Sequence, residues 1–111
     1  TINDATRNVG ATGAVLCDRS IAERWYRFEG AGGTQMPTTP PAAYMCSTHA
    51  PGWLNGAHPA NPGDTVARQA CFNWATSTCR WSTNIQVTNC DGYFVYWLAR
   101  TSACSLRYCT E

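Results

Sequence analysis

Seven cysteines in 111 residues are the feature that most constrains how this chain can fold. A chain of this length forms one domain with a thin hydrophobic core, which often needs additional cross-links. Disulfides persist in oxidising compartments, so the cysteine content predicts a secreted, extracellular protein. A metal site is less favoured, because no Cys-x-x-Cys pair occurs and both histidines, His49 and His58, lie in segments rich in proline and glycine. The odd number of cysteines leaves one without a partner in the chain.

The charge of the chain argues against two classes of partner. The net charge is +1 and every basic residue is an arginine, with no clustered basic stretch. Nucleic acids and anionic membranes both require such a cluster. No apolar run is long enough to cross a bilayer, so we expect no membrane insertion. Since a basic-then-apolar leader is also missing, we expect a mature secreted protein from which the signal has been removed.

The most informative local pattern is NIQVTNCDGYFVYWL, residues 84–98. Asp-Gly between two alternating apolar runs is typical of a two-residue hairpin turn with positive φ, and the turn fixes the register. The predicted pairs on one face are Cys90–Tyr93, Thr88–Val95 and Gln86–Trp97. Those on the other face are Asn89–Phe94, Val87–Tyr96 and Ile85–Leu98. The second face is mostly apolar and should cover the core, so Cys90, Tyr93, Val95 and Trp97 should point outward.

Three further segments give weaker predictions. The alternation in ERWYRFEG (23–30) predicts a strand with Trp25 and Arg27 on one face and Tyr26 and Phe28 on the other. VARQACFNWA (66–75) fits a short helix or a strand equally well. PGWLNGAHPANPGD (51–64) holds three prolines and three glycines, a density that predicts ordered loop and neither helix nor strand.

Several long stretches carry a family resemblance. They are WYRFEGAGGTQMP (25–37), CSTHAPGWLNGAHP (46–59), AC (70–71), CRW (79–81), GYFVYWL (92–98) and the SLRYCT run after Cys104. Together they resemble the cysteine-rich domain family of uromodulin and the pancreatic zymogen-granule membrane glycoprotein. The resemblance implies a mainly β fold, a small disulfide-stabilised single domain of antiparallel hairpins with long ordered loops. It leaves residues 1–16 as an N-terminal extension packed on the domain and 17–111 as the uromodulin-like cysteine-rich domain.

The same resemblance implies a disulfide pairing. The implied pairs are Cys17–Cys104, Cys46–Cys109 and Cys71–Cys79. Cys90 is left over, because its partner in longer family members lies upstream of the domain. We therefore predict a symmetric homodimer linked through Cys90, the alternative being a free or thiol-capped Cys90. Within 51–64 the resemblance indicates that Trp53 and Leu54 enter the core and that Asn55–Gly56 turns the chain.

The chain lacks the residue patterns of an enzyme, because no nucleophile, base and orienting group can be assigned and the two loop histidines are more often structural. Carbohydrate binding fits better, since aromatic rings cover the apolar faces of sugars while amides and carboxylates meet their hydroxyls. Trp25, Trp53, Trp74 and Trp81 are assigned to packing, and Trp97 to the surface. The chain also resembles stand-alone cnidarian lectins, which implies calcium-dependent binding of glycans with terminal galactose.

Calcium requires several oxygen ligands. The best candidates for a combined sugar and calcium site are Asp64 in NPGD, Asn61 across the proline, and Glu29 at the start of EGAGG. Arg24 or Arg27 pairing with Glu29 is an equally good interpretation of that carboxylate. Asp91 is assigned to the hairpin turn. Two other functions stay open, an extracellular protein-binding or adhesion module without lectin activity and a disulfide-rich defence or toxin protein.

Overall fold

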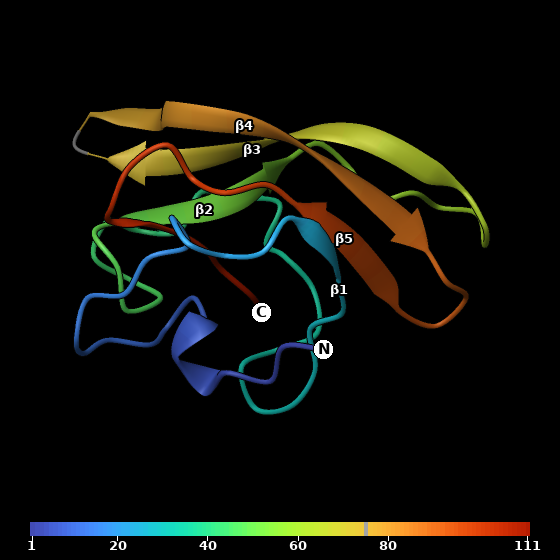
Figure 1. The fold of residues 1–111 in the computed structure, drawn as a ribbon, viewed down its shortest axis with the longest axis horizontal. Coiled ribbons are helices and arrows are strands. Elements are labelled where there is room, and N and C mark those ends of the chain that lie inside the picture. Colours follow the sequence, from blue (N-terminus) through green and yellow to red (C-terminus); the bar gives the residue numbers. More distant parts are fainter. Residues whose placement is uncertain (75) are drawn as a thin grey trace.

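The computed structural model describes residues 1–74 and 76–111, and it is built around one curled six-stranded sheet (Figure 1). The elements are the 3-10 turn η1 (Ala5–Arg7) and the strands β1 (Arg24–Tyr26), β2 (Ala50–Asn55), β3 (Thr65–Trp74), β4 (Ser77–Asn89), β5 (Phe94–Leu98) and β6 (Leu106–Tyr108). The strand order is β1-β5-β4-β3-β2-β6, antiparallel except for the β2–β6 pair. The predicted mainly β fold is confirmed. Within the described ranges, no helix has the length and apolar character needed to cross a membrane.

The β4–β5 hairpin has the predicted register. Its ladder pairs are Gln86–Trp97, Val87–Tyr96, Thr88–Val95 and Asn89–Phe94, and the Cys90 N–H donates to the Tyr93 carbonyl at 2.8 Å. Asp91 and Gly92 have φ values of 57° and 109°, which is the positive-φ turn that Asp-Gly favours. The predicted inner face is confirmed: Ile85, Val87, Tyr96 and Leu98 are buried, and Phe94 at its end is partly buried and packs against the core.

Segment 51–64 contains a strand, so the prediction that it holds none is wrong for its first residues. β2 lies inside the sheet, between β3 and β6. Its bonds to the β6 side run from the Ala50 N–H to the Ser105 carbonyl and from the Cys109 N–H to the Gly52 carbonyl. Pro51 lies between these two bonding positions, and the pairing of β2 with β3 begins only at Gly52. No ladder hydrogen bond therefore requires the backbone N–H that proline lacks.

Gly52 is required by the close approach of its neighbours. A Cβ at this position would lie 2.6 Å from a ring carbon of Phe72 and 2.8 Å from the Arg107 carbonyl oxygen. The next two residues, Trp53 and Leu54, are buried as predicted, and the strand ends before Gly56, whose φ of 136° turns the chain. Proline and glycine are thus tolerated inside strand β2, because neither residue removes a hydrogen bond at its position.

The ambiguous segment 66–75 forms a strand as far as Trp74, and its last residue lies outside the described residues. β3 pairs with β2 on one side and with β4 on the other. Non-local pairing therefore decides between the two interpretations that local periodicity left open. In Figure 1 the N-terminal segment, η1 and both termini lie on one side of the sheet. The core is formed by Tyr26, Phe28, Met36, Ala50, Leu54, Ala70, Phe72, Ile85, Val87, Tyr96, Leu98, Leu106 and Tyr108.

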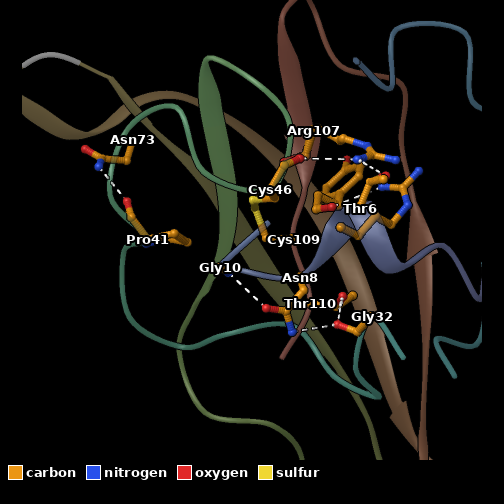
Figure 2. Close-up of a disulfide and its surroundings, with 12 residues drawn as sticks. Thr6, Asn8, Gly10, Gly32, Pro41, Cys46, Asn73, Arg107, Cys109 and Thr110 are labelled. Carbon is orange, nitrogen blue, oxygen red and sulfur yellow. Dashed lines mark hydrogen bonds between the residues drawn. A yellow bond between two sulfur atoms is a disulfide. The ribbon is translucent and has the colours of Figure 1, made fainter. Parts of the chain in front are cut away.

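All three implied disulfides are present, and Cys90 is a free, partly buried cysteine. The bonds are Cys17–Cys104, Cys46–Cys109 and Cys71–Cys79. The first two join residues 87 and 63 positions apart, whereas the third joins neighbouring strands across 8 positions. Figure 2 shows the Cys46–Cys109 bond beside Arg107, which donates to the Cys46 carbonyl at 3.2 Å.

Residues 1–16 are held against the sheet by two buried arginines. The Arg7 guanidinium donates two hydrogen bonds to the Asp18 carboxylate, at 2.8 and 2.7 Å. Arg107 on β6 reaches back to Asp4 at 2.6 Å and to the Thr6 hydroxyl at 2.8 Å. The hydrogen bonds from Thr6 and the charge of Arg107 hold the pKa of the Asp4 carboxyl below its usual range. Two isolated parallel β-bridges, Ile2–Phe28 and Asn8–Thr110, also connect this segment to the rest of the domain.

Candidate functional site

Asn61 and Asp64 form one exposed turn just before β3 begins. The Asp64 N–H donates to the Asn61 carbonyl at 3.1 Å, which closes the turn. Asn89 at the end of β4 fixes the turn from the side, because its N–H donates to the Asp64 carbonyl at 3.0 Å and its carbonyl accepts from the Gly63 N–H at 2.7 Å. The structure therefore brings together two of the three predicted calcium ligands.

Glu29 is not brought to that turn. It follows β1, which is separated from β3 by β5 and β4 in the sheet. Its carboxylate lies 3.9 Å from the Arg27 Nε, so the ion pair proposed as an alternative for this residue is present. Across residues 1–74 and 76–111, no group of three or more His, Cys, Asp or Glu side chains is arranged to hold a metal ion. A calcium ion at the turn would take its ligands from Asp64, Asn61, backbone carbonyls and water.

A cavity of about 130 Å³ lies beside Glu29, and sequence reasoning did not find it. It opens between the end of β1, the 34–35 loop and the β4–β5 turn. Its lining residues are Arg27, Phe28, Thr34, Gln35, Gly92, Tyr93 and Phe94. The backbone N–H groups of Thr34 and Gln35 donate to the Glu111 carbonyl at 3.0 and 3.4 Å, and these bonds fix the loop that forms one wall.

The cavity combines an aromatic ring with hydrogen-bonding groups. The Tyr93 side chain is 37% exposed, and the Arg27 guanidinium carbon lies 3.8 Å from the centroid of its ring. In the part of the chain that the structure describes, the Arg27 guanidinium, the Thr34 hydroxyl and the Gln35 side-chain amide have no intramolecular hydrogen bond. These three groups are therefore available to a ligand that enters the cavity.

The orientation of two residues that line this cavity could be predicted from the sequence. The hairpin register predicted that Tyr93 points outward, and the strand alternation placed Arg27 on the face opposite to that of Phe28. The position of Thr34 and Gln35 depends on Glu111, more than seventy residues away in the chain, and nothing local indicates it. The face that carries Tyr93 also holds Trp25, which pairs with Trp97 across β1 and β5 and is 44% exposed. The assignment of Trp25 to packing is therefore wrong, because its side chain lies on the outer face of the sheet and not on the core face, where Tyr26 of the same strand is buried.

His58 is a structural histidine, as predicted. Its Nε2 lies 2.7 Å from the Tyr96 hydroxyl, and its ring centroid lies 4.5 Å from that of Phe94. Burial, and then the positive charge of Arg68, hold the pKa of His58 below its usual value. His49 lies elsewhere, in an aromatic group with Tyr44 and Trp74.

The fold and the disulfides define a class, the small disulfide-stabilised β domains of secretory-pathway proteins. The chain belongs to the uromodulin-like domain family, whose sequence profile matches residues 26–110. Dog (Canis lupus familiaris) pancreatic secretory granule membrane major glycoprotein GP2 is 48% identical over 100 residues, which cover 89% of this chain and 19% of GP2. Mouse (Mus musculus) uromodulin is 45% identical over 96 residues, covering 86% of this chain and 15% of uromodulin. Human (Homo sapiens) GP2 is 43% identical over 101 residues, covering 90% of this chain and 19% of that protein.

The chain thus spans less than a quarter of the length of these relatives. It corresponds to one domain of these longer proteins, the uromodulin-like domain.

Proposed function

We propose that this domain is a secreted lectin that binds glycans with terminal galactose in a calcium-dependent manner. The observation that carries the proposal is the cavity, in which the Tyr93 ring lies among an amide, a hydroxyl and a guanidinium without intramolecular hydrogen bonds to the residues described. This is the combination that sugars require, because each pyranose has an apolar face and a rim of hydroxyls.

The size and composition of the cavity favour a single sugar residue. Its volume of about 130 Å³ is well below the roughly 300–1,000 Å³ of sites for drug-sized ligands. The exposed part of the Tyr93 ring would pack on the apolar face of galactose. The Gln35 amide and the Thr34 hydroxyl would bond to sugar hydroxyls, and the Arg27 guanidinium, which lies against the Tyr93 ring, would donate a further hydrogen bond. Glu29, proposed from the sequence as a calcium ligand, would in this arrangement hold Arg27 in place.

Calcium would act at the Asn61–Asp64 turn. Calcium takes six to eight oxygen ligands, and this turn offers a carboxylate, a side-chain amide and several carbonyls. The turn and the cavity flank the same end of the β4–β5 hairpin, because Asn89 bonds to Gly63 and Asp64 and pairs with Phe94, which lines the cavity. A bound ion would order this end of the sheet, and a sugar diol could complete its coordination.

We expect the wild-type protein to bind galactose-terminated glycans on an array in calcium and to lose that binding in chelator. Tyr93→Ala should weaken binding by about tenfold or more, since truncating a central aromatic contact commonly costs more than about 1.4 kcal/mol. Asp64→Ala should abolish the calcium response while changing the free energy of unfolding by less than about 0.5 kcal/mol, because its side chain is exposed.

Tyr44→Ala is the matched control, since it removes an aromatic side chain that is 62% exposed and does not line the cavity. It should leave glycan binding unchanged. Binding that survives Tyr93→Ala would place the sugar elsewhere on the domain, and binding that survives the chelator would remove calcium from the mechanism. An array without any bound glycan would contradict lectin activity and favour the adhesion module.

The proposed lectin is bivalent through a Cys90–Cys90 disulfide between two copies. Cys90 is free and directly follows β4. In the dimer, Val95 and Trp97 on the same face of the hairpin would contact the second copy, whereas Tyr93 would stay open to the sugar. A self-complementary patch with a cysteine near the twofold axis allows this residue to meet its own copy. Two sites on one particle would let a weak lectin agglutinate cells through avidity.

We therefore expect a dimer band on non-reducing electrophoresis that collapses to monomer on reduction. Cys90→Ser should run as monomer and lose agglutination while it keeps binding to immobilised glycans. A wild-type protein that runs as monomer, with Cys90 recovered in alkylated form, would exclude the covalent dimer.

A further inference from the structure

His58 anchors the loop of residues 57–64, here called the 57–64 loop, against the sheet. Its Nε2 lies 2.7 Å from the Tyr96 hydroxyl, which also accepts a hydrogen bond from the Met36 N–H at 3.0 Å. The chain of contacts His58–Tyr96–Met36 thus crosses from the loop through β5 to the residue that follows Gln35. Gln35 and Phe94 line the proposed sugar cavity, and the Phe94 ring stacks on His58.

The donors and acceptors available along the His58–Tyr96–Met36 contacts determine the protonation state of His58. The Tyr96 side chain is fully buried, and its phenol hydrogen has no acceptor other than His58 Nε2 among the residues the structure describes. The phenol therefore donates to Nε2 of a neutral His58 and accepts from Met36, which satisfies the phenol, His58 Nε2 and the Met36 N–H. A protonated His58 would carry a hydrogen on Nε2, and the buried phenol hydrogen would then have no acceptor.

The charges around His58 oppose protonation further. β3 contributes Arg68, which also donates from Nε to the Ala57 carbonyl at 2.9 Å. β5 contributes Phe94 and Tyr96, and burial followed by the charge of Glu111 raises the pKa of the Tyr96 phenol, so it stays neutral. β4 contributes only Asn89, an untitratable residue that donates to the Pro59 carbonyl at 2.9 Å. Among the described residues, no element that packs on His58 offers it a carboxylate in hydrogen-bond contact.

From this arrangement we infer that His58 is a pH-sensitive anchor of the proposed sugar site: its protonation breaks the His58–Tyr96–Met36 chain, releases the 57–64 loop and loosens the Gln35 wall of the cavity. The inference rests on the proposed function for its effect on sugar binding, whereas the conformational step rests on the structure alone. Its consequence is a lectin that holds its ligand near neutral pH and releases it in a mildly acidic compartment.

The direction of the effect follows from proton linkage. We call the form with the 57–64 loop anchored the closed form and the form with the loop released the open form. In the closed form the pKa of His58 is lowered by burial and by Arg68, whereas in the open form it returns to its usual value of about 6.5. The open form therefore binds the proton more tightly. The closed form is fully favoured above that usual value and is progressively lost as the pH falls toward the lowered pKa.

The test follows two readouts in the full chain between pH 7.5 and pH 5 at constant calcium. The first is hydrogen exchange of the Met36 amide, corrected for the intrinsic rate, together with NMR titration of the His58 ring. Protection of Met36 should fall with the His58 titration, by about tenfold for each unit of pKa difference between the closed and open forms. The second is the affinity for lactose, a galactose-terminated probe, which should fall over the same range.

Three variants separate this inference from a general effect of acid. His58→Gln retains a side-chain oxygen that can accept from Tyr96 but does not titrate, so Met36 protection and lactose affinity should become independent of pH. His49→Gln removes the other histidine, which has no contact with this chain of bonds, and should keep the wild-type profile. Tyr96→Phe removes the acceptor of the Met36 N–H and should lower Met36 protection already at pH 7.5.

The inference is overturned if His58→Gln keeps the wild-type acid response, or if Met36 protection does not follow the His58 titration. Lactose that fails to bind the wild type even at pH 7.5 would contradict the proposed function, while the Met36 readout would still decide whether His58 acts as the anchor. Lactose that binds equally well at both pH values would leave the lectin proposal standing and refute the regulation.

Discussion

Asp18→Asn is expected to lower the free energy of unfolding by about 3–5 kcal/mol, the typical cost of removing one partner of a buried ion pair. The Asp18 side chain is 4% exposed and accepts two hydrogen bonds from Arg7 and a third from the Tyr108 N–H at 2.9 Å. Asparagine nearly preserves the shape but leaves the Arg7 charge buried without a counter-charge. Urea unfolding followed by tryptophan fluorescence measures the difference.

Glu29→Gln is the matched control for this experiment. It also removes one carboxylate from an arginine pair, but the Arg27–Glu29 contact is 3.9 Å long and lies at the surface. Exposed pairs contribute about 0–1 kcal/mol, so its unfolding midpoint should stay close to that of the wild type. Equal losses in the two variants would mean that the buried pair contributes no more than a surface one.

The second large effect concerns the long-range disulfides. The double variant Cys46→Ala/Cys109→Ala should lose about 2–5 kcal/mol of stability, as removal of a native disulfide from a small secreted domain typically does. The bond joins residues 63 positions apart, and both cysteines are fully buried beside Arg107 (Figure 2). Its loss would free the unfolded chain and also leave a gap beneath β6.

Cys71→Ala/Cys79→Ala provides the comparison, because that bond closes a loop across only 8 positions within the β3–β4 pair. On the chain-entropy account the shorter loop contributes about 2 kcal/mol less stability than the longer one. Thermal or denaturant unfolding of both double variants under the same conditions gives the ranking. If the short-loop variant proves the less stable of the two, local packing rather than loop closure determines the contribution of these bonds.

The features that could be predicted from the sequence are those with a local cause or a family precedent. The Asp91–Gly92 turn fixes the register of β4 and β5, so both faces of that hairpin follow from it. The disulfides followed from the resemblance to the uromodulin family. Pro51 was misinterpreted because the rule against proline in a sheet applies only where a ladder bond is needed, and the bonding positions of β2 depend on β6, more than fifty residues later.

The candidate site was predictable only in part, for the same reason. Asn61 and Asp64 share a turn whose sequence separation is three residues, so local reasoning placed them together. Glu29 is separated from them by the order of the strands, which no local pattern reveals. The cavity depends on the contact of the 34–35 loop with Glu111 and on the register of β1 with β5. Both are tertiary contacts between segments that carry no common motif.

From the parallel pairing of β2 with β6 we expect a defined order of folding events during synthesis. Until residues 104–110 have left the ribosome, β2 has no neighbour on one side, and Cys17 and Cys46 have no partners for oxidation. The β3–β4–β5 part of the sheet contains only neighbouring strands and can form earlier. Until then we expect the nascent domain to expose a strand edge and the thiols of Cys17 and Cys46 in addition to that of Cys90. In this state chaperones and disulfide isomerases of an oxidising compartment would act on it. We therefore expect the pairing of β6 with β2 to be the step that completes folding of the domain.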